Sequence, residues 1–195
     1  MKVGVLALQG AFREHQKAFQ SCGVETEQIR KPEQLANISA LVIPGGESTT
    51  IGKLLIAYDL LDPIKKLGEQ GMPVFGTCAG MILMARDIAG STQPRLGFMD
   101  ITVERNAFGR QVNSFEAKLD IPVLGKDPFP AVFIRAPYVL RVESPVEILS
   151  TFDEKIIFVR QGRFLAAAFH PELTGDLRVH RYFLEHCCNP NQPNN

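Results

Sequence analysis

The stretch Pro73-Val74-Phe75-Gly76-Thr77-Cys78-Ala79-Gly80 decides how this chain folds. Its apolar start predicts a buried strand over residues 73–75, and its small residues predict a tight turn into a helix over 79–88. Glycine near Cys78 on both sides lets backbone and helix pass closely. This is the pattern of a nucleophile elbow, with cysteine in place of serine. A small buried cysteine under a glycine-rich turn would give the same pattern, so this stretch alone leaves catalysis open.

The segments before this turn alternate between strands and helices. The continuous apolar run over 3–8 predicts a buried parallel strand, and the apolar residues Phe12, Phe19 and Cys22 predict the helix that follows it. The predicted strands are 3–8, 24–29 and 40–43, and the predicted helices are 11–22, 49–58 and 63–70. This alternation with short connections is typical of α/β proteins. We therefore expect a mostly parallel, doubly wound, flavodoxin-like sheet.

The second half of the chain has a different pattern. Between residues 96 and 169 the segments are short, rich in Val, Ile and Phe, and separated by Gly and Pro. We interpret them as mostly antiparallel additions with a final return to the main sheet. The candidate strands are 101–105, 131–134, 146–149, 156–159 and 164–169, followed by a helix over 176–186. We expect a single domain over 1–188 and a frayed tail over 189–195.

Composition argues against several classes of function. The 21 basic and 21 acidic residues leave a formal net charge of +0, so no strong field attracts nucleic acid or an anionic membrane. The apolar stretches are too short to span a bilayer, and the absence of a signal-peptide pattern predicts a cytoplasmic protein. The cysteines, expected to be reduced thiols, show no metal-like spacing with the histidines, so no metal site is expected.

A second motif, His170-Pro171-Glu172, supplies the groups that a reactive thiol needs. In an extended segment, residues i and i+2 project to the same side, and Pro171 disfavours helical geometry at His170. The Glu172 carboxylate can then accept from one imidazole nitrogen while the other faces Cys78. A histidine that merely ends a core strand is the alternative. Both motifs follow predicted strands, however, and sites gather at the carboxyl edge of parallel sheets, which favours a catalytic interpretation.

A glycine-rich turn, Pro44-Gly45-Gly46-Glu47-Ser48, also follows a predicted strand. Consecutive glycines allow backbone N–H groups to turn inward, so Gly46 could stabilise an oxyanion together with the amide of Ala79. An ordinary Gly-Gly turn capped by Ser48 is the alternative. Ser48 is not the expected nucleophile, because no base lies beside it in the sequence.

Two arginine-containing segments could complete a binding site. Arg105 lies in a polar, glycine-broken stretch and could hold a substrate carboxylate with its forked donors. The segment Phe133-Ile134-Arg135-Ala136-Pro137 could form the opposite wall. Surface salt bridges are the alternative for each arginine. The remaining histidines lie on predicted helices among charged residues and are assigned no chemistry, namely His15, His180 and His186.

Together these motifs resemble the class I, or triad, glutamine amidotransferases, and among them the family of glutaminase subunits of pyridoxal 5′-phosphate synthase. The resemblance extends through nearly the whole chain, up to about Cys188. The matching stretches are Leu8-Gln9-Gly10, Pro44-Gly45-Gly46-Glu47-Ser48-Thr49-Thr50, Gly76-Thr77-Cys78-Ala79-Gly80, Val103-Glu104-Arg105-Asn106-Ala107-Phe108-Gly109-Arg110-Gln111, Phe133-Ile134-Arg135-Ala136-Pro137 and Phe169-His170-Pro171-Glu172-Leu173-Thr174.

The resemblance implies hydrolysis of L-glutamine to L-glutamate and ammonia. Cys78 would attack the side-chain amide and form a thioester, His170 would carry the proton, and Glu172 would orient His170. The residues implied in glutamine binding are Gly46, Glu47, Ser48, Arg105, Ile134 and Arg135. The resemblance also implies no cofactor, and a hetero-oligomeric complex with a separate synthase (lyase) subunit that receives the ammonia and activates the glutaminase.

Two other interpretations compete with this one. A cysteine hydrolase of the ThiJ/PfpI-like superfamily would share the sheet and the elbow, but such proteins usually place histidine directly after the cysteine, where this chain has Ala79. A non-catalytic, glutaminase-like regulatory subunit would be expected to have lost a triad member, whereas Cys78, His170 and Glu172 are all present.

Overall fold

The computed structural model of this protein describes residues 1–105 and 114–189. Residues 106–111 of the Arg105 motif and the predicted tail over 190–195 lie outside the described residues.

Strands and helices alternate along the first half, as the sequence predicts. The strands are β1 (Lys2–Leu6), β2 (Glu25–Ile29), β3 (Ala40–Ile43), β4 (Val74–Thr77), β5 (Ala85–Ile88), β6 (Met99–Glu104), β7 (Ser114–Leu119), β8 (Phe129–Ile134), β9 (Tyr138–Val142), β10 (Glu147–Phe152), β11 (Lys155–Gln161) and β12 (Phe164–Ala167). The α-helices are α1 (Phe12–Ser21), α2 (Ser48–Ala57), α3 (Leu61–Glu69), α4 (Ala79–Met84) and α5 (Arg178–Tyr182). Shorter helical turns are η1 (Pro32–Asn37), η2 (Pro122–Leu124), η3 (Pro171–Leu173) and η4 (Phe183–Cys187).

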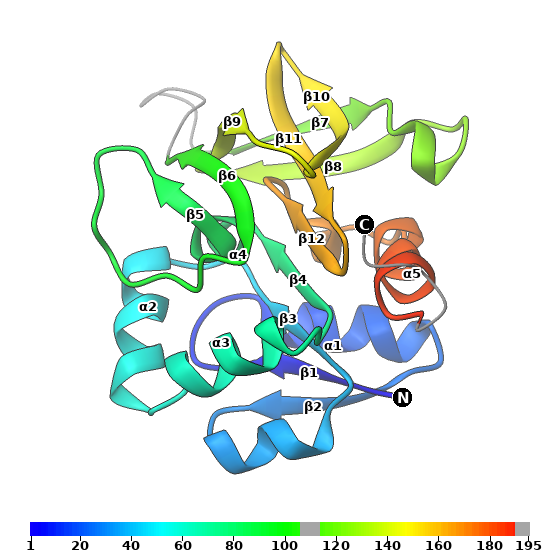
Figure 1. Ribbon diagram of the computed structural model, residues 1–195. Helices are drawn as coiled ribbons and strands as arrows, with labels where there is room; N and C mark the ends of the chain where they lie inside the picture. The colour runs from blue at the N-terminus through cyan, green and yellow to red at the C-terminus, as the bar shows by residue number, and fades with distance from the viewer. Residues whose placement is uncertain (106–113, 190–195) are drawn as a thin grey trace.

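A mixed sheet runs through the centre of the molecule (Figure 1). Among the described residues it has ten strands in the order β2-β1-β3-β4-β12-β11-β9-β6-β5, with β10 paired to β11. The pairs from β2 to β12 are parallel. β11 pairs antiparallel with β12, β9 and β10, and β9 pairs antiparallel with β6. The predicted α/β sheet with antiparallel additions in the second half is therefore confirmed.

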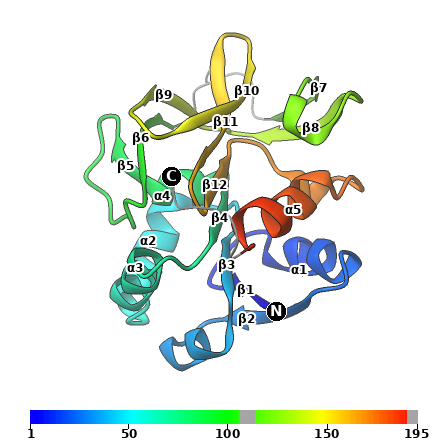
Figure 2. The same ribbon diagram turned by 45° about the vertical axis from the view of Figure 1, so that its right-hand side comes forward.

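Helices cover both faces of the parallel part of the sheet. Figure 2 shows α2 and α3 on one side of the strands and α1 and α5 on the other. The central strands between them are buried on both faces, as in β3, where all four residues are buried. Burial on both faces is the reason that these strands have continuous apolar sequences rather than alternating ones.

The predicted helix over 79–88 is wrong in its second half. Helix α4 ends at Met84, and Ala85 has an extended backbone (φ −66°, ψ 143°) that begins β5. β5 pairs in parallel with β6, burying Ala85 and Ile88 while Arg86 and Asp87 remain exposed. Strand pairing here overrides the helical preference of the sequence, because a sheet neighbour supplies the backbone hydrogen bonds.

Three further differences concern the second half of the chain. Strands β7 and β9 are absent from the prediction, and the strand predicted over 164–169 ends at Ala167. β7 pairs with β8 as a separate two-stranded sheet, and its charged residues alternate with partly buried ones. The closing helix begins at Arg178 and continues into the η4 turn.

The carboxyl ends of β3, β4 and β12 lie side by side. In the register of these strands, Ile43 pairs with Gly76 and Ala167 pairs with Thr77. The segments that follow the three strands therefore emerge at one edge, and they carry the three motifs that the sequence analysis identified.

Candidate active site

Cys78 occupies the turn between β4 and α4 in a strained backbone conformation. Its φ of 48° and ψ of −101° lie in a region that residues with a side chain rarely adopt. The Cys78 N–H donates to the Ala167 carbonyl at 2.8 Å, which ties the turn to β12. A Cβ atom on Gly80 would collide with the Ile43 carbonyl, so glycine is required there. This local structure matches the predicted nucleophile elbow.

His170 and Glu172 form a buried, hydrogen-bonded pair. The His170 Nδ1 atom lies 2.8 Å from Glu172 Oε1, and each residue is 6% exposed. The motif is not fully extended, because Pro171–Leu173 form a 3₁₀ turn with His170 as the residue before it. His170 itself keeps a non-helical backbone (φ −108°, ψ 84°), so the carboxylate still reaches the imidazole.

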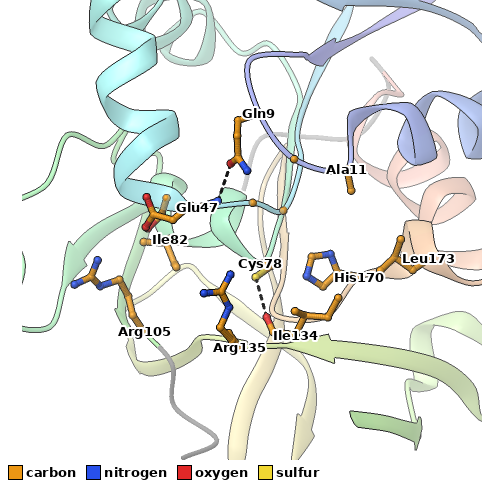
Figure 3. A pocket seen from close by; sticks show the side chains of 14 residues that line it. Gln9, Ala11, Glu47, Cys78, Ile82, Arg105, Ile134, Arg135, His170 and Leu173 are labelled. Atoms are coloured by element: carbon orange, nitrogen blue, oxygen red, sulfur yellow. Dashed lines mark hydrogen bonds between the residues drawn. The ribbon is translucent and has the colours of Figure 1, made fainter. Parts of the chain in front are cut away.

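The electrostatics of this pair favour opposite charges. Burial opposes charge on the ring, but hydrogen bonds with Cys78 and Glu172 raise the pKa of His170 to about 10. Burial likewise opposes the carboxylate charge, but His15 and the hydrogen-bonded His170 hold the pKa of Glu172 below its ordinary value. Figure 3 shows the Cys78 sulfur and the His170 ring side by side. The structure thus brings together the three predicted catalytic side chains.

A cavity of about 330 Å³ opens in front of Cys78 and His170 (Figure 3). The predicted substrate-binding residues all line it, namely Gly46, Glu47, Ser48, Arg105, Ile134 and Arg135. Residues without a predicted role also line it, namely Gln9, Gly10, Ala11, Gly45, Ile82 and Leu173. Ala79 and Glu172 are buried and are not among the residues that line the cavity.

The backbone of the glycine-rich loop forms hydrogen bonds with Thr77, Ala11 and Gln9. The Gly45 N–H donates to Thr77 Oγ1 at 3.1 Å, and the Gly45 carbonyl accepts from the Ala11 N–H at 3.1 Å. The Glu47 N–H donates to Gln9 Oε1 at 2.8 Å (Figure 3). The amides of Gly45 and Glu47 are therefore engaged, whereas the oxyanion roles of Gly46 and Ala79 stay a prediction.

The carboxylate of Glu47 points at the N-terminus of helix α2. It precedes α2 and accepts from the backbone N–H groups of Thr49 and Thr50. Burial opposes its charge, but hydrogen bonds from Thr49 and Thr50 lower the pKa of Glu47 to about 2. The carboxylate is consequently a helix cap, and a contribution to substrate binding would come from the backbone of this residue.

Arg105 and Ser48 share a partner that the sequence analysis missed. Gln93 Oε1 accepts from Arg105 Nη1 at 3.1 Å and from Ser48 Oγ at 3.3 Å. Arg135, beyond the end of β8, has a φ of 42°, and the preceding Ile134 carbonyl lies 3.7 Å from Cys78 Sγ. Gln93 lies in a segment without periodic pattern, so its sequence gives no signal of this role.

His15 and His180 are fully buried behind the site, although the sequence analysis assigned them no chemistry. His15 lies on α1, three residues after Phe12 and four before Phe19. That spacing places it on the buried stripe of the helix, and this was the available signal.

Among the described residues, no group of three or more His, Cys, Asp or Glu side chains is arranged to hold a metal ion. In the same part of the chain, no helix has both the length and the apolar character needed to cross a bilayer.

Fold and site define an α/β protein of the triad-type, cysteine-dependent amidotransferase class. The chain belongs to the SNO glutamine amidotransferase family, whose model matches residues 5–189. This membership excludes the ThiJ/PfpI-like alternative.

Known proteins of high similarity agree with this membership. The chain is 73% identical over 192 residues to "Pyridoxal 5'-phosphate synthase subunit PdxT" of Pelotomaculum thermopropionicum, with 98% of each sequence covered. It is 63% identical over 185 residues to the protein of the same name from Moorella thermoacetica, which covers 95% of this chain and 98% of that one. A crystal structure described as a glutamine amidotransferase is 53% identical, with a TM-score of 0.90 over 95% of this chain and 98% of its own.

Proposed function

We propose that this chain is the glutaminase subunit of a pyridoxal 5′-phosphate synthase. It hydrolyses L-glutamine to L-glutamate and ammonia and supplies the ammonia to a separate synthase subunit. The observation that carries this proposal is the buried chain of Cys78, His170 and Glu172, which opens on a cavity of about 330 Å³. Relatives that are 73% and 63% identical and carry the synthase subunit name support the choice of pathway.

The chemistry follows from the properties of the three side chains. The Cys78 sulfur attacks the side-chain amide carbon of glutamine, and the thiol proton resides on His170. The oxyanion of the tetrahedral intermediate accepts hydrogen bonds from the Gly46 and Ala79 amides. His170 returns the proton to the departing ammonia, leaving a γ-glutamyl thioester that water hydrolyses. Glu172 keeps the imidazole oriented and stabilises its charge throughout.

Substrate specificity is assigned to the polar wall of the cavity. Arg105 and Arg135 carry guanidinium groups whose donors suit the α-carboxylate of glutamine. Gly46, Ser48 and the Ile134 carbonyl offer polar groups around the remaining atoms. The volume of the cavity suits a single amino acid rather than a peptide.

A partner subunit is needed for physical reasons. Ammonia released into water at neutral pH takes up a proton and is no longer a nucleophile, so a sealed transfer to the synthase keeps it reactive. We further propose that residues 1–188 form a single glutaminase domain and that the complex works in the cytoplasm, where the thiol stays reduced.

The decisive experiment measures glutamate release from glutamine, with and without the cognate synthase subunit. We expect release by the complex to be abolished in Cys78→Ala while the variant still docks. Cys22→Ala, which removes a cysteine outside the cavity, serves as the matched control and should keep full activity. Glutamate release by the Cys78→Ala complex at the wild-type rate would overturn the proposed nucleophile and mechanism.

A further inference from the structure

A second polar network lies behind the Glu172 carboxylate, away from the cavity. His15 Nε2 lies 3.4 Å from Glu172 Oε2 and 3.0 Å from Thr77 Oγ1. On the other side of the ring, His15 Nδ1 lies 3.1 Å from His180 Nε2. Both histidines and Thr77 are 0% exposed, and the network joins α1, β4 and α5 to the η3 turn.

The positions of the hydrogen atoms follow from the needs of the carboxylate. Glu172 Oε2 is buried and has no hydrogen-bond partner among the described residues, and His15 Nε2, 3.4 Å away, is the ring nitrogen that faces it. A buried carboxylate oxygen requires a donor, so the proton of His15 belongs on Nε2. His15 Nδ1 then accepts from the N–H of His180 Nε2. If the proton of His15 were on Nδ1 instead, the lone pair of Nε2 would face the carboxylate. His180 would then carry its proton on Nδ1, a buried atom that has no hydrogen-bond partner among the described residues.

Both rings are suited to act as neutral donors. Burial lowers the pKa of His15, with Glu172 and Glu14 opposing this effect and His170 adding to it. Burial also lowers the pKa of His180, to about 3, and a positive charge on His15 would lower it further. A single positive charge can then reside on His170, next to the sulfur, rather than on the ring behind the carboxylate.

We propose that His15 is a positioning residue of this site, whose Nε2–H holds the second oxygen of Glu172 while His180 fixes its tautomer. The inference rests on the proposed function, because it assigns His15 a part in that reaction. Held at Oε2 by His15, the carboxylate presents Oε1 to His170 in one orientation.

Thr77 extends the same network to the other parts of the site. Its hydroxyl oxygen lies 3.0 Å from His15 Nε2 and accepts from the Gly45 N–H at 3.1 Å. Thr77 also directly precedes Cys78. His15 therefore lies next to Glu172 and Thr77, and Thr77 connects it to the elbow at Cys78 and to the glycine-rich loop. His15 itself does not line the cavity.

The test uses the glutaminase bound to its synthase subunit and compares two substitutions of one residue. His15→Phe keeps a flat ring beside Phe75, whose ring centroid lies 5.8 Å from that of His15, but it removes the donor to Glu172. We expect kcat to fall by about tenfold to a hundredfold, since a buried charged group is left unsatisfied. KM should stay within about twofold, because His15 lies outside the cavity. His15→Gln, whose amide nitrogen can replace Nε2, should restore most of kcat.

Controls separate positioning from stability. His186→Phe removes a histidine outside the network and should leave kcat unchanged. If His15→Phe does not fold, His15→Asn replaces it, because its amide is one methylene too short to reach Glu172 Oε2. An unchanged kcat in a folded loss variant, an equal loss in His15→Gln, or a rise in KM alone would overturn the inference. If the wild-type complex releases no glutamate, the proposed function itself fails, and this inference fails with it.

Discussion

Lowering the pH should decrease the free energy of unfolding, because His180 is buried as a neutral ring. The ring is 0% exposed and lies between apolar groups, with ring centroids 4.9 Å from Phe19 and 6.0 Å from Phe75. Burial lowers its pKa from 6.5 to about 3, and His15 adds to this shift. The unfolded chain therefore takes up a proton near pH 6.5, whereas the folded protein does not do so until about pH 3.

The sign and size of the effect follow from this difference. The stability contributed by His180 is fully present above pH 6.5 and is lost as the pH falls toward 3. Between pH 7 and pH 5 the free energy of unfolding should decrease by about 2 kcal/mol through this residue alone. Removing His180 removes this dependence. The difference in stability between the wild-type protein and His180→Phe should therefore shrink by about 2 kcal/mol over that interval.

Urea unfolding at each pH, followed by far-ultraviolet circular dichroism, provides the measurement, since the chain has no tryptophan to serve as a fluorescent probe. Other titrating groups are common to both proteins and largely cancel in the comparison. His180→Gln keeps a polar side chain but takes up no proton in this range, so it should flatten the profile equally. Parallel profiles for the wild-type protein and both variants would refute the argument that His180 is held neutral by burial.

Three further predictions concern the site and its supports. In Gly45→Ala the new Cβ would run into the His170 ring, with Nδ1 only 2.8 Å away; we expect kcat for glutamate release to fall about a hundredfold, and a fully active, folded variant would contradict this. Glu47→Ala removes the cap of α2 and should lower the free energy of unfolding by about 0.5–2 kcal/mol, measured by urea unfolding, whereas unaltered stability would show that the cap is dispensable. Arg105→Ala should raise KM for glutamine with little change in kcat, and an unaltered KM would remove Arg105 from substrate binding.

Sequence patterns predicted the parallel half of the fold well because each of its elements has one dominant local signal. β3 has the predicted bounds of 40–43, and α1 lies within its predicted range of 11–22. The end of α4 was missed because residues 85–88 form a strand only through pairing with β6, a neighbour that comes later in the chain. Strand β7 was missed for a similar reason, since its apolar side is defined by pairing with β8.

The candidate site divides in the same way. The elbow around Cys78 requires an unusual backbone conformation, and the motif at His170 pairs two side chains that are close in sequence. Both features can therefore be recognised in a single stretch of sequence. Gln93 reaches Arg105 and Ser48 from a segment without pattern. His15 meets His180 although 165 positions separate them, so the two appeared as unrelated helical histidines.

By itself the sequence determined the class of fold, the cysteine that lies at the elbow and the pairing of imidazole with carboxylate, because backbone preferences and short-range geometry are encoded locally. Only the tertiary structure decided what surrounds these groups: the distance of 2.8 Å between His170 and Glu172, the cap made by Glu47, and the buried histidines behind the carboxylate. The burial and the charge environment of a site depend on segments that are far apart in the chain. These segments surround the site only after the strands have paired and the helices have packed against them.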